Sequence, residues 1–331
     1  MKDIRVYLEA FSERVLPAEA CRHDGSGCVL KGCIDLYGAT GDAAYRDAVL
    51  RLLEARLAPD GSVSGLGPHD VGGMSIGRAL FFALDETGDE RYRRAIERLM
   101  QRLREQSSAA CGSLPVRSGQ SCLEWLYATQ PFAMQYEMRF GGMEHVGDVA
   151  RAFKTARSLL FDGDKGLYHA ACDAAQSPAD GETGLREGYS LRETGFLLMA
   201  LIDCIELCSE QLYEHYRAMI DIFREAMRGL LRWQDGETGL FAERIDRAGE
   251  GQPEVCGSAM AAYALLKAVR LGVLDEEKYM PIARRVLGAL AAHTPQVRGG
   301  AQECGPGLPD DGLCTGVFMM VCSEALLAGK E

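Results

Sequence analysis

The stretch LYGATGDAAY at residues 36–45 returns in altered form as LDETGDERY at residues 84–92. Each copy follows an apolar segment and precedes an amphipathic one. Glycine at the end of a helix readily adopts the left-handed conformation that stops the helix, and an aspartate directly after it can cap the next helix. The repeated stretch therefore predicts the turn of a helical hairpin, with Tyr45 and Tyr92 packing back onto the first helix.

Weaker copies of this turn occur further along the chain, at residues 139–149 and 271–279. Apolar residues recur with helical periodicity in the second helices of two hairpins, at 92–104 and 216–231. Polar turns that enter a short extended piece close several helices, at 60–63, 162–168 and 235–241. The pattern corresponds to roughly five or six hairpins, a repeat typical of helical arrays.

We therefore predict an all-α fold in which six helical hairpins close into an (α/α)6 toroid; an open superhelix of hairpins is the alternative. No tract rich in Ser, Gly or Pro divides the chain, so residues 1–331 are expected to form a single domain. In a toroid, loops from distant parts of the chain surround one mouth and supply its binding residues. A sugar-sized cavity is expected at the centre.

The composition limits the kinds of partner. A net charge of −12 and the lack of a basic stripe disfavour nucleic acids and anionic membranes. The first residues are charged and lack the apolar core of a signal peptide, and no stretch is long and apolar enough to span a membrane. A cytoplasmic location is therefore expected, with the 12 cysteines mostly serving as small core residues. The sequence leaves open a homo-oligomer.

Four segments, in order, resemble motifs of glycoside hydrolase family 105, the unsaturated rhamnogalacturonyl hydrolases, and more distantly of family 88. EWLYATQPF at 124–132 resembles the helix D-x-LYMxxPF of that family, and GLYH at 166–169 resembles GLYYHG. SLRETGF at 190–196, followed by LMALID at 198–203, resembles W-x-R-x-x-GW…MALID. EVCGSAM at 254–260 resembles ETSGSAM.

This resemblance implies a specific reaction on the product of a polysaccharide lyase, an oligosaccharide that ends in a 4,5-unsaturated uronic acid. A carboxyl group protonates C4 of the vinyl ether and activates water for attack at C5. The resulting hemiketal opens and releases the next sugar. Such general acid–base work needs a carboxyl whose pKa is raised by its surroundings, and it needs no cofactor or metal.

The resemblance places two acidic residues in catalytic roles. Glu124 occupies the position of the family's catalytic aspartate, and it is one methylene longer. Asp70, in the segment PHDVGG at 68–73, resembles the second acidic position. A second carboxylate nearby would raise the pKa of its partner by like-charge repulsion. Each residue also has a structural interpretation, because aspartate and glutamate are common at helix starts.

The substrate is an anion, and an arginine can hold a carboxylate with two hydrogen bonds, so Arg192 is the first candidate for binding it. His169 would contact sugar hydroxyls or the attacking water. The remaining expected substrate-binding residues, which the matching segments supply, are His69, Trp125, Phe196 and Glu254. Only two tryptophans occur in the chain, so aromatic stacking on sugars would be sparse.

Three other functions remain alternatives at this point. A zinc site would use Cys21, His23, Cys28 and Cys33, or the dispersed thiols Cys256 and Cys304 as in lanthionine-cyclase toroids, although the spacing departs from the usual C-x2–4-C. A sugar epimerase would bring more histidines into the mouth than the 6 in the chain allow. A sugar-binding relative without catalysis would fit the glutamate at 124 and the sparse aromatic lining.

Overall fold

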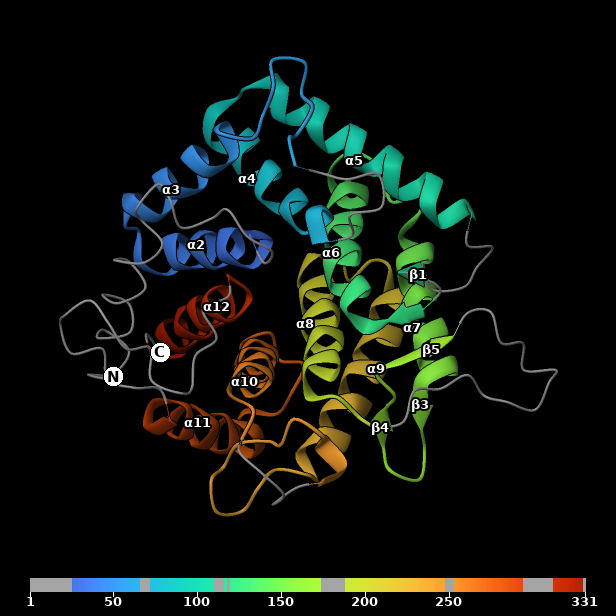
Figure 1. The fold of residues 1–331 in the computed structure, drawn as a ribbon, viewed down its shortest axis with the longest axis vertical. Coiled ribbons are helices and arrows are strands. Elements are labelled where there is room, and N and C mark those ends of the chain that lie inside the picture. Colours follow the sequence, from blue (N-terminus) through green and yellow to red (C-terminus); the bar gives the residue numbers. More distant parts are fainter. Residues whose placement is uncertain are drawn as a thin grey trace.

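The computed structural model describes residues 26–65, 72–109, 116–117, 120–173, 188–247, 253–293 and 312–329. Within these residues the chain is dominated by helices, which alternate along the sequence between an inner and an outer position (Figure 1). The inner helices are α2 (Ser26–Thr40), α4 (Gly77–Thr87), α6 (Leu123–Arg139), α8 (Leu191–Leu207), α10 (Val255–Arg270) and α12 (Gly312–Ala328). The outer helices are α3 (Ala43–Glu54), α5 (Glu90–Ala109), α7 (Val146–Leu160), α9 (Tyr213–Leu231) and α11 (Glu276–His293).

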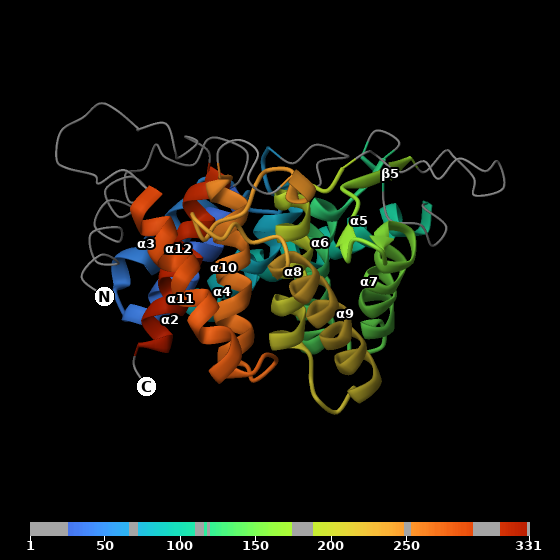
Figure 2. The same ribbon diagram turned by 90° about the horizontal axis from the view of Figure 1, so that it is seen from below.

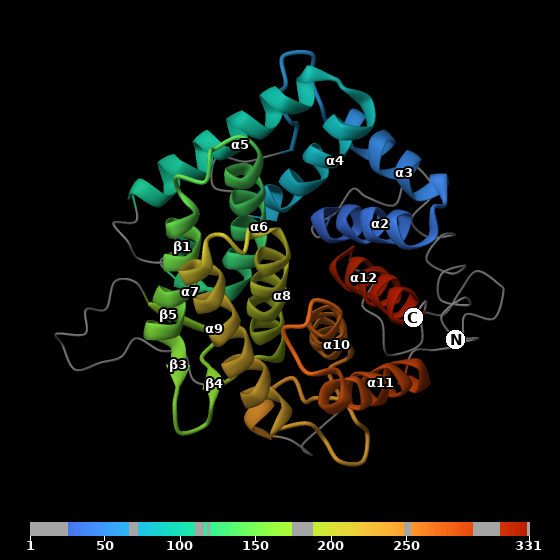
Figure 3. The same ribbon diagram turned by 180° about the vertical axis from the view of Figure 1, so that it is seen from behind.

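The inner helices form a closed ring. Each packs against the next, from α2 to α4 and on to α12, and α12 packs in turn against α2. Seen edge-on, helices of both rings run between the same two faces (Figure 2), and the view from behind shows α8, α10 and α12 inside α9 and α11 (Figure 3). The chain therefore forms the predicted toroid rather than an open superhelix.

Burial explains the two positions. Every residue of α10 from Cys256 to Val269 is buried, because an inner helix is covered on all sides and must be apolar all round. The outer helix α9 buries only one stripe, and that stripe includes Met219, Phe223 and Leu230. An outer helix packs one face against the ring and leaves the other in water, so it is amphipathic.

The hairpin turns follow the sequence prediction. Gly41 and Gly88 have φ angles of +74° and +68°, the left-handed region in which glycine is favoured. Asp42 accepts a hydrogen bond from the backbone N–H of Ala44 at 2.9 Å, and thereby caps α3. Asp89 accepts one from the N–H of Arg91 at 2.8 Å. Tyr45 and Tyr92 are buried, as expected.

Short strands, in the part of the chain that the structure describes, lie in the connections between helices. β3 (Phe161–Asp162) pairs with β4 (Leu167–Tyr168), at one of the extended pieces that the sequence predicts. A second antiparallel sheet joins β1 (Val116–Arg117), β2 (Gln120–Cys122) and β5 (Ala171–Asp173). The sequence did not indicate this sheet, whose strands are 2 or 3 residues long, too short to show an alternating pattern.

Cysteines add to the apolar interior. Those whose side chains the structure describes are all buried: Cys28, Cys33, Cys204, Cys208, Cys256, Cys314 and Cys322. They serve as small core residues, as expected, and Cys28 and Cys33 lie on α2. Cys21, His23 and Cys304 lie outside the described residues.

Among the helices that the structure describes, none has the length and apolar character needed to cross a membrane.

Candidate active site

Three inner helices, α6, α8 and α10, meet at their amino-terminal ends. We call this region the amino-terminal rim. It consists of Leu123–Glu124 at the start of α6, Ser190–Glu193 at the start of α8, and Glu254, which caps α10. Glu124 lies in the first turn of α6, directly after β2, and is half-buried. The first backbone N–H groups of a helix have no partner within it. Glu193 supplies that partner, since its Oε2 accepts from the N–H of Leu123 at 2.9 Å and of Glu124 at 3.0 Å.

Glu193 is therefore the acidic neighbour of Glu124 at this rim. Burial raises the pKa of Glu193 from its ordinary 4.5 to about 7, and the charge of Glu124 adds to the rise, whereas the two backbone hydrogen bonds oppose it. Raised pKa values of this kind are typical of acid–base sites. Glu193 belongs to a Ser-x-x-Glu pattern that starts at Ser190, and such a pattern is ordinarily explained as a local capping box. For that reason the sequence did not single it out.

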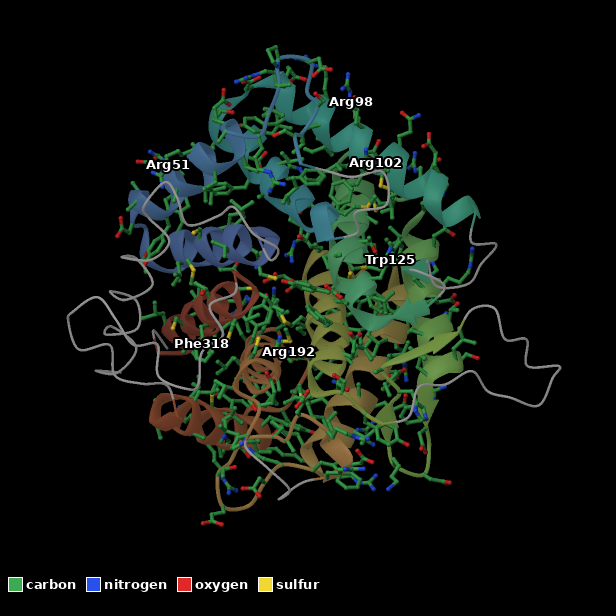
Figure 4. All side chains as sticks on the ribbon, in the orientation of Figure 1. Arg51, Arg98, Arg102, Trp125, Arg192 and Phe318 are labelled. Atoms are coloured by element: carbon green, nitrogen blue, oxygen red, sulfur yellow. The ribbon has the colours of Figure 1, made fainter. Side chains whose placement is uncertain are left out.

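On the other side of α8, Arg192 reaches α10. Its Nε donates to Oε1 of Glu254 at 3.0 Å, and the Arg192 side chain keeps 37% of its surface exposed against 13% for Glu254. Glu254 also caps α10, because its second carboxylate oxygen accepts from the N–H of Gly257. Figure 4 shows Arg192 near the middle of the ring, by α8 and α10. Three of the candidate site residues, Glu124, Arg192 and Glu254, thus lie on one rim of the structure.

His169 lies beside the segment that leads into α8. It follows β4, and its ring is 4.8 Å from the ring of Tyr189, which directly precedes the Ser190 cap. The Tyr189 hydroxyl donates to Asp162 and is the largest cause of the lowered pKa of that carboxyl. His169 is half-buried, and this stacking fixes the ring against the entry to α8.

The two predicted aromatic contacts are buried in this structure. Trp125 follows Glu124 on α6 and is 3% exposed, and Phe196 lies one turn after Arg192 and is 6% exposed. The Phe196 ring packs 5.8 Å from the ring of Tyr127. Both therefore form the apolar wall directly behind the rim residues. The two predicted residues His69 and Asp70 lie outside the described residues.

Comparison with known proteins gives one family and several similar structures. Residues 17–304 match the model of Glycosyl Hydrolase Family 88. A 24.9 kDa protein in the picA locus of Rhizobium radiobacter is 30% identical over 167 residues, which are 48% of this chain and 70% of that protein. A family 105 glycoside hydrolase from C. acetobutylicum is 23% identical, with a TM-score of 0.82 over 98% of this chain and 99% of that one. The unsaturated glucuronyl hydrolase of Bacillus sp. GL1 is 14% identical, with a TM-score of 0.67 over 98% and 94%.

Proposed function

This chain belongs to glycosyl hydrolase family 88 and is a glycoside hydrolase, and from this premise we propose that its substrate is an oligosaccharide ending in a 4,5-unsaturated uronic acid. A lyase that cleaves an acidic polysaccharide leaves such an end. The similar enzyme of Bacillus sp. GL1 is an unsaturated glucuronyl hydrolase responsible for the degradation of glycosaminoglycan, and its activity supports this class of substrate. The motifs shared with family 105 favour an unsaturated rhamnogalacturonyl product.

The observation on which the proposal rests is that acidic and basic side chains start neighbouring inner helices at the rim. Glu124 starts α6, Arg192 starts α8, and Glu193, next to Arg192 in the chain, holds the first backbone amides of α6. An unsaturated uronate presents a carboxylate attached to C5, next to the C4=C5 bond. A guanidinium that binds this carboxylate sets the reacting carbons beside an acid held on the neighbouring helix.

In the proposed reaction, Glu124 donates its proton to C4. The positive charge that develops at C5 is shared with the ring oxygen, and a water molecule adds to C5. The Glu124 carboxylate takes the proton that this water loses, so that the group returns to its starting state. The product is a hemiketal at C5, whose ring opening releases the next sugar.

The other predicted residues would complete the site. Asp70 would share the acid–base work, His69 and His169 would bind sugar hydroxyls or the attacking water, and Glu254 would orient Arg192. Trp125 and Phe196 are buried, so they would support the rim residues from behind and would not stack on the sugar. A cytoplasmic location, where such lyase products would be consumed, also stays a prediction.

Loss of ultraviolet absorbance tests the proposal directly, because hydration removes the conjugated double bond of the substrate. We expect the wild-type chain to bleach at least one member of a panel of unsaturated disaccharides, and Glu124→Gln to abolish the bleaching while the chain still folds. An absorbance that stays constant across the whole panel would contradict the hydrolase proposal and favour a sugar-binding relative without catalysis. Full activity in Glu124→Gln would move the acid to another residue, with Asp70 as the first candidate.

A further inference from the structure

Glu193 forms a link between two inner helices that is separate from the local cap of its own helix. Ser190 caps α8 and accepts from the backbone N–H of Glu193 at 3.5 Å. In a complete capping box the glutamate carboxylate would turn back to the N–H of the capping serine. Here the carboxylate turns outward to the first two amides of α6, 69 and 70 residues earlier in the chain.

The consequence falls on Glu124. The two amides that Glu193 binds are those of Glu124 and of the residue before it, so the link fixes the backbone from which the Glu124 side chain projects. β2 ends immediately before this point, so the first turn of α6 follows a strand directly. Without Glu193, the first turn of α6 would have two buried donors to satisfy in another way.

We propose that Glu193 is the positioning residue of Glu124: it clamps the first turn of α6 through both amides, and its own ionisation adds a negative charge beside Glu124 and Arg192 that opposes binding of the anionic substrate. This inference rests on the proposed role of Glu124 as the acid. It assigns to Glu193 no proton transfer to the substrate.

The electrostatic surroundings determine the direction of the pH dependence. Among the described residues, the charged groups at the rim are Glu124 on α6, Arg192 on α8 itself and Glu254 on α10, and Arg192 pairs with Glu254. Glu124 is the charge that acts on Glu193, whose pKa of about 7 lies above its ordinary 4.5. The folded chain therefore binds this proton more tightly than the unfolded chain. The contribution of Glu193 to the free energy of unfolding is therefore fully present below pH 4.5 and is lost as the pH rises toward 7.

Two substitutions separate the clamp from the charge. Glu193→Gln keeps an oxygen that accepts from both amides but cannot ionise, whereas Glu193→Ala removes both features. The matched control is Glu276→Gln, at an exposed glutamate in the first turn of the outer helix α11. For all four chains, kcat and KM would be measured by ultraviolet bleaching from pH 5 to 9, and unfolding by urea at pH 5 and pH 8.

We expect kcat/KM of the wild type to fall above about pH 7, toward about tenfold per pH unit, mainly through a rise in KM. Glu193→Gln should keep its low-pH activity and lose the rise in KM. Glu193→Ala should lower kcat at every pH with KM little changed, because a displaced acid costs about 100-fold in rate. Glu276→Gln should behave as the wild type. An unchanged rise of KM with pH in Glu193→Gln, or wild-type kcat in Glu193→Ala, would overturn the proposal, as would an inactive Glu193→Gln beside an active Glu124→Gln.

Urea unfolding tests the role of Glu193 even if no substrate is found. A wild type that bleaches nothing would contradict the proposed function, but burial and the charge of Glu124 would still make ionisation of Glu193 unfavourable in the folded chain. We then expect the stability of the wild type, relative to Glu193→Gln, to be lower at pH 8 than at pH 5. A difference between the two chains that is the same at both pH values would refute the raised pKa of Glu193, and a Glu193→Ala chain as stable at pH 5 as Glu193→Gln would refute the clamp, in both cases independently of any activity.

Discussion

In the proposed site Arg192 holds the uronate carboxylate, and its hydrogen bond to Glu254 orients the guanidinium. The hydrogen bond from Nε to Glu254 uses one edge of the planar guanidinium group, and the Arg192 side chain remains 37% exposed. A planar fork can bind Glu254 and present further N–H donors to a ligand in one geometry. A lysine ammonium at this position has no second edge, so it would bind one of the two carboxylates at the expense of the other.

We therefore predict that Arg192→Lys raises KM for the unsaturated substrate by about 10-fold or more, which corresponds to the loss of one charge-assisted hydrogen bond, and lowers kcat less. Initial rates of bleaching over a range of substrate concentrations measure both constants. Arg98→Lys is the matched control, since Arg98 lies on the outer helix α5 and pairs with Asp60. If Arg192→Lys keeps the wild-type KM, the uronate carboxylate binds elsewhere.

At the scale of single residues, the sequence predicts what is local. Gly41 and Asp42 are adjacent, and their conformation and cap depend on neighbours within a few residues, so a short motif was enough to identify them. The contact between Glu193 and the start of α6 joins residues 70 and 69 positions apart. A Ser-x-x-Glu pattern has a complete local explanation, and nothing in it indicates that the carboxylate turns to another helix.

At the scale of helices, the inner ring has a fully buried charge, Asp203, directly after the buried apolar run 196–202 of α8. Asp203 on α8 is fully buried and binds Arg78 of α4, Lys267 of α10 at 2.6 Å and the hydroxyl of Tyr263 at 2.7 Å. Burial alone would raise the pKa of Asp203, but the positive charges of Arg78 and Lys267 hold it below its usual range. One carboxylate thus ties three inner helices together.

We predict that Asp203→Asn lowers the free energy of unfolding by about 3–5 kcal/mol, because it removes the counter-charge of the largely buried Arg78 and leaves buried Lys267 paired with Glu206 alone. Urea unfolding followed by circular dichroism at pH 7 would measure the loss. The pKa of Asp203 is depressed, so its contribution to stability is present above the unfolded value, about 3.9, and is lost as the pH falls below it. Asp221→Asn, at an exposed position of α9, should change stability by less than about 0.5 kcal/mol; an equal effect at both positions would show that the network is not stabilising.

The repeat of helical hairpins and the positions of two outer helices could be predicted, but the ion pairs between inner helices could not. The pattern at 92–104 lies within α5 (Glu90–Ala109), and the pattern at 216–231 lies within α9 (Tyr213–Leu231), because amphipathic periodicity shows directly in outer helices. Inner helices are apolar all round and lose this periodicity, so the sequence does not show which faces of α4, α8 and α10 meet. Asp203 appeared only as the last residue of a family-like motif.

At the scale of the whole molecule, the fold depends on the contact between its last and first described helices. α12 closes the ring against α2, and small residues allow the two backbones to approach. A Cβ built on Gly32 would lie 2.8 Å from the carbonyl oxygen of Gly316, and one on Gly316 would overlap the backbone of Cys28. A repeat predicts that hairpins stack on one another, but closure of the stack depends on this close approach, which no local pattern encodes.

Substitution of one of these glycines tests whether closure stabilises the toroid. Gly316→Ala adds a methyl group whose nearest neighbours are backbone atoms of α2, and backbone cannot move aside as a flexible side chain can. We expect it to cost about 2 kcal/mol or more, the range of overpacked core substitutions, and to lower the urea midpoint. Gly288→Ala is the matched control, because a Cβ at this exposed position inside α11 meets nothing within 4 Å and alanine is favoured over glycine in a helix by about 0.5–1 kcal/mol. The two variants should therefore shift the midpoint in opposite directions. A stable Gly316→Ala would mean that α12 can move outward without loss, and that the ring is held by its neighbouring contacts instead of by its closure.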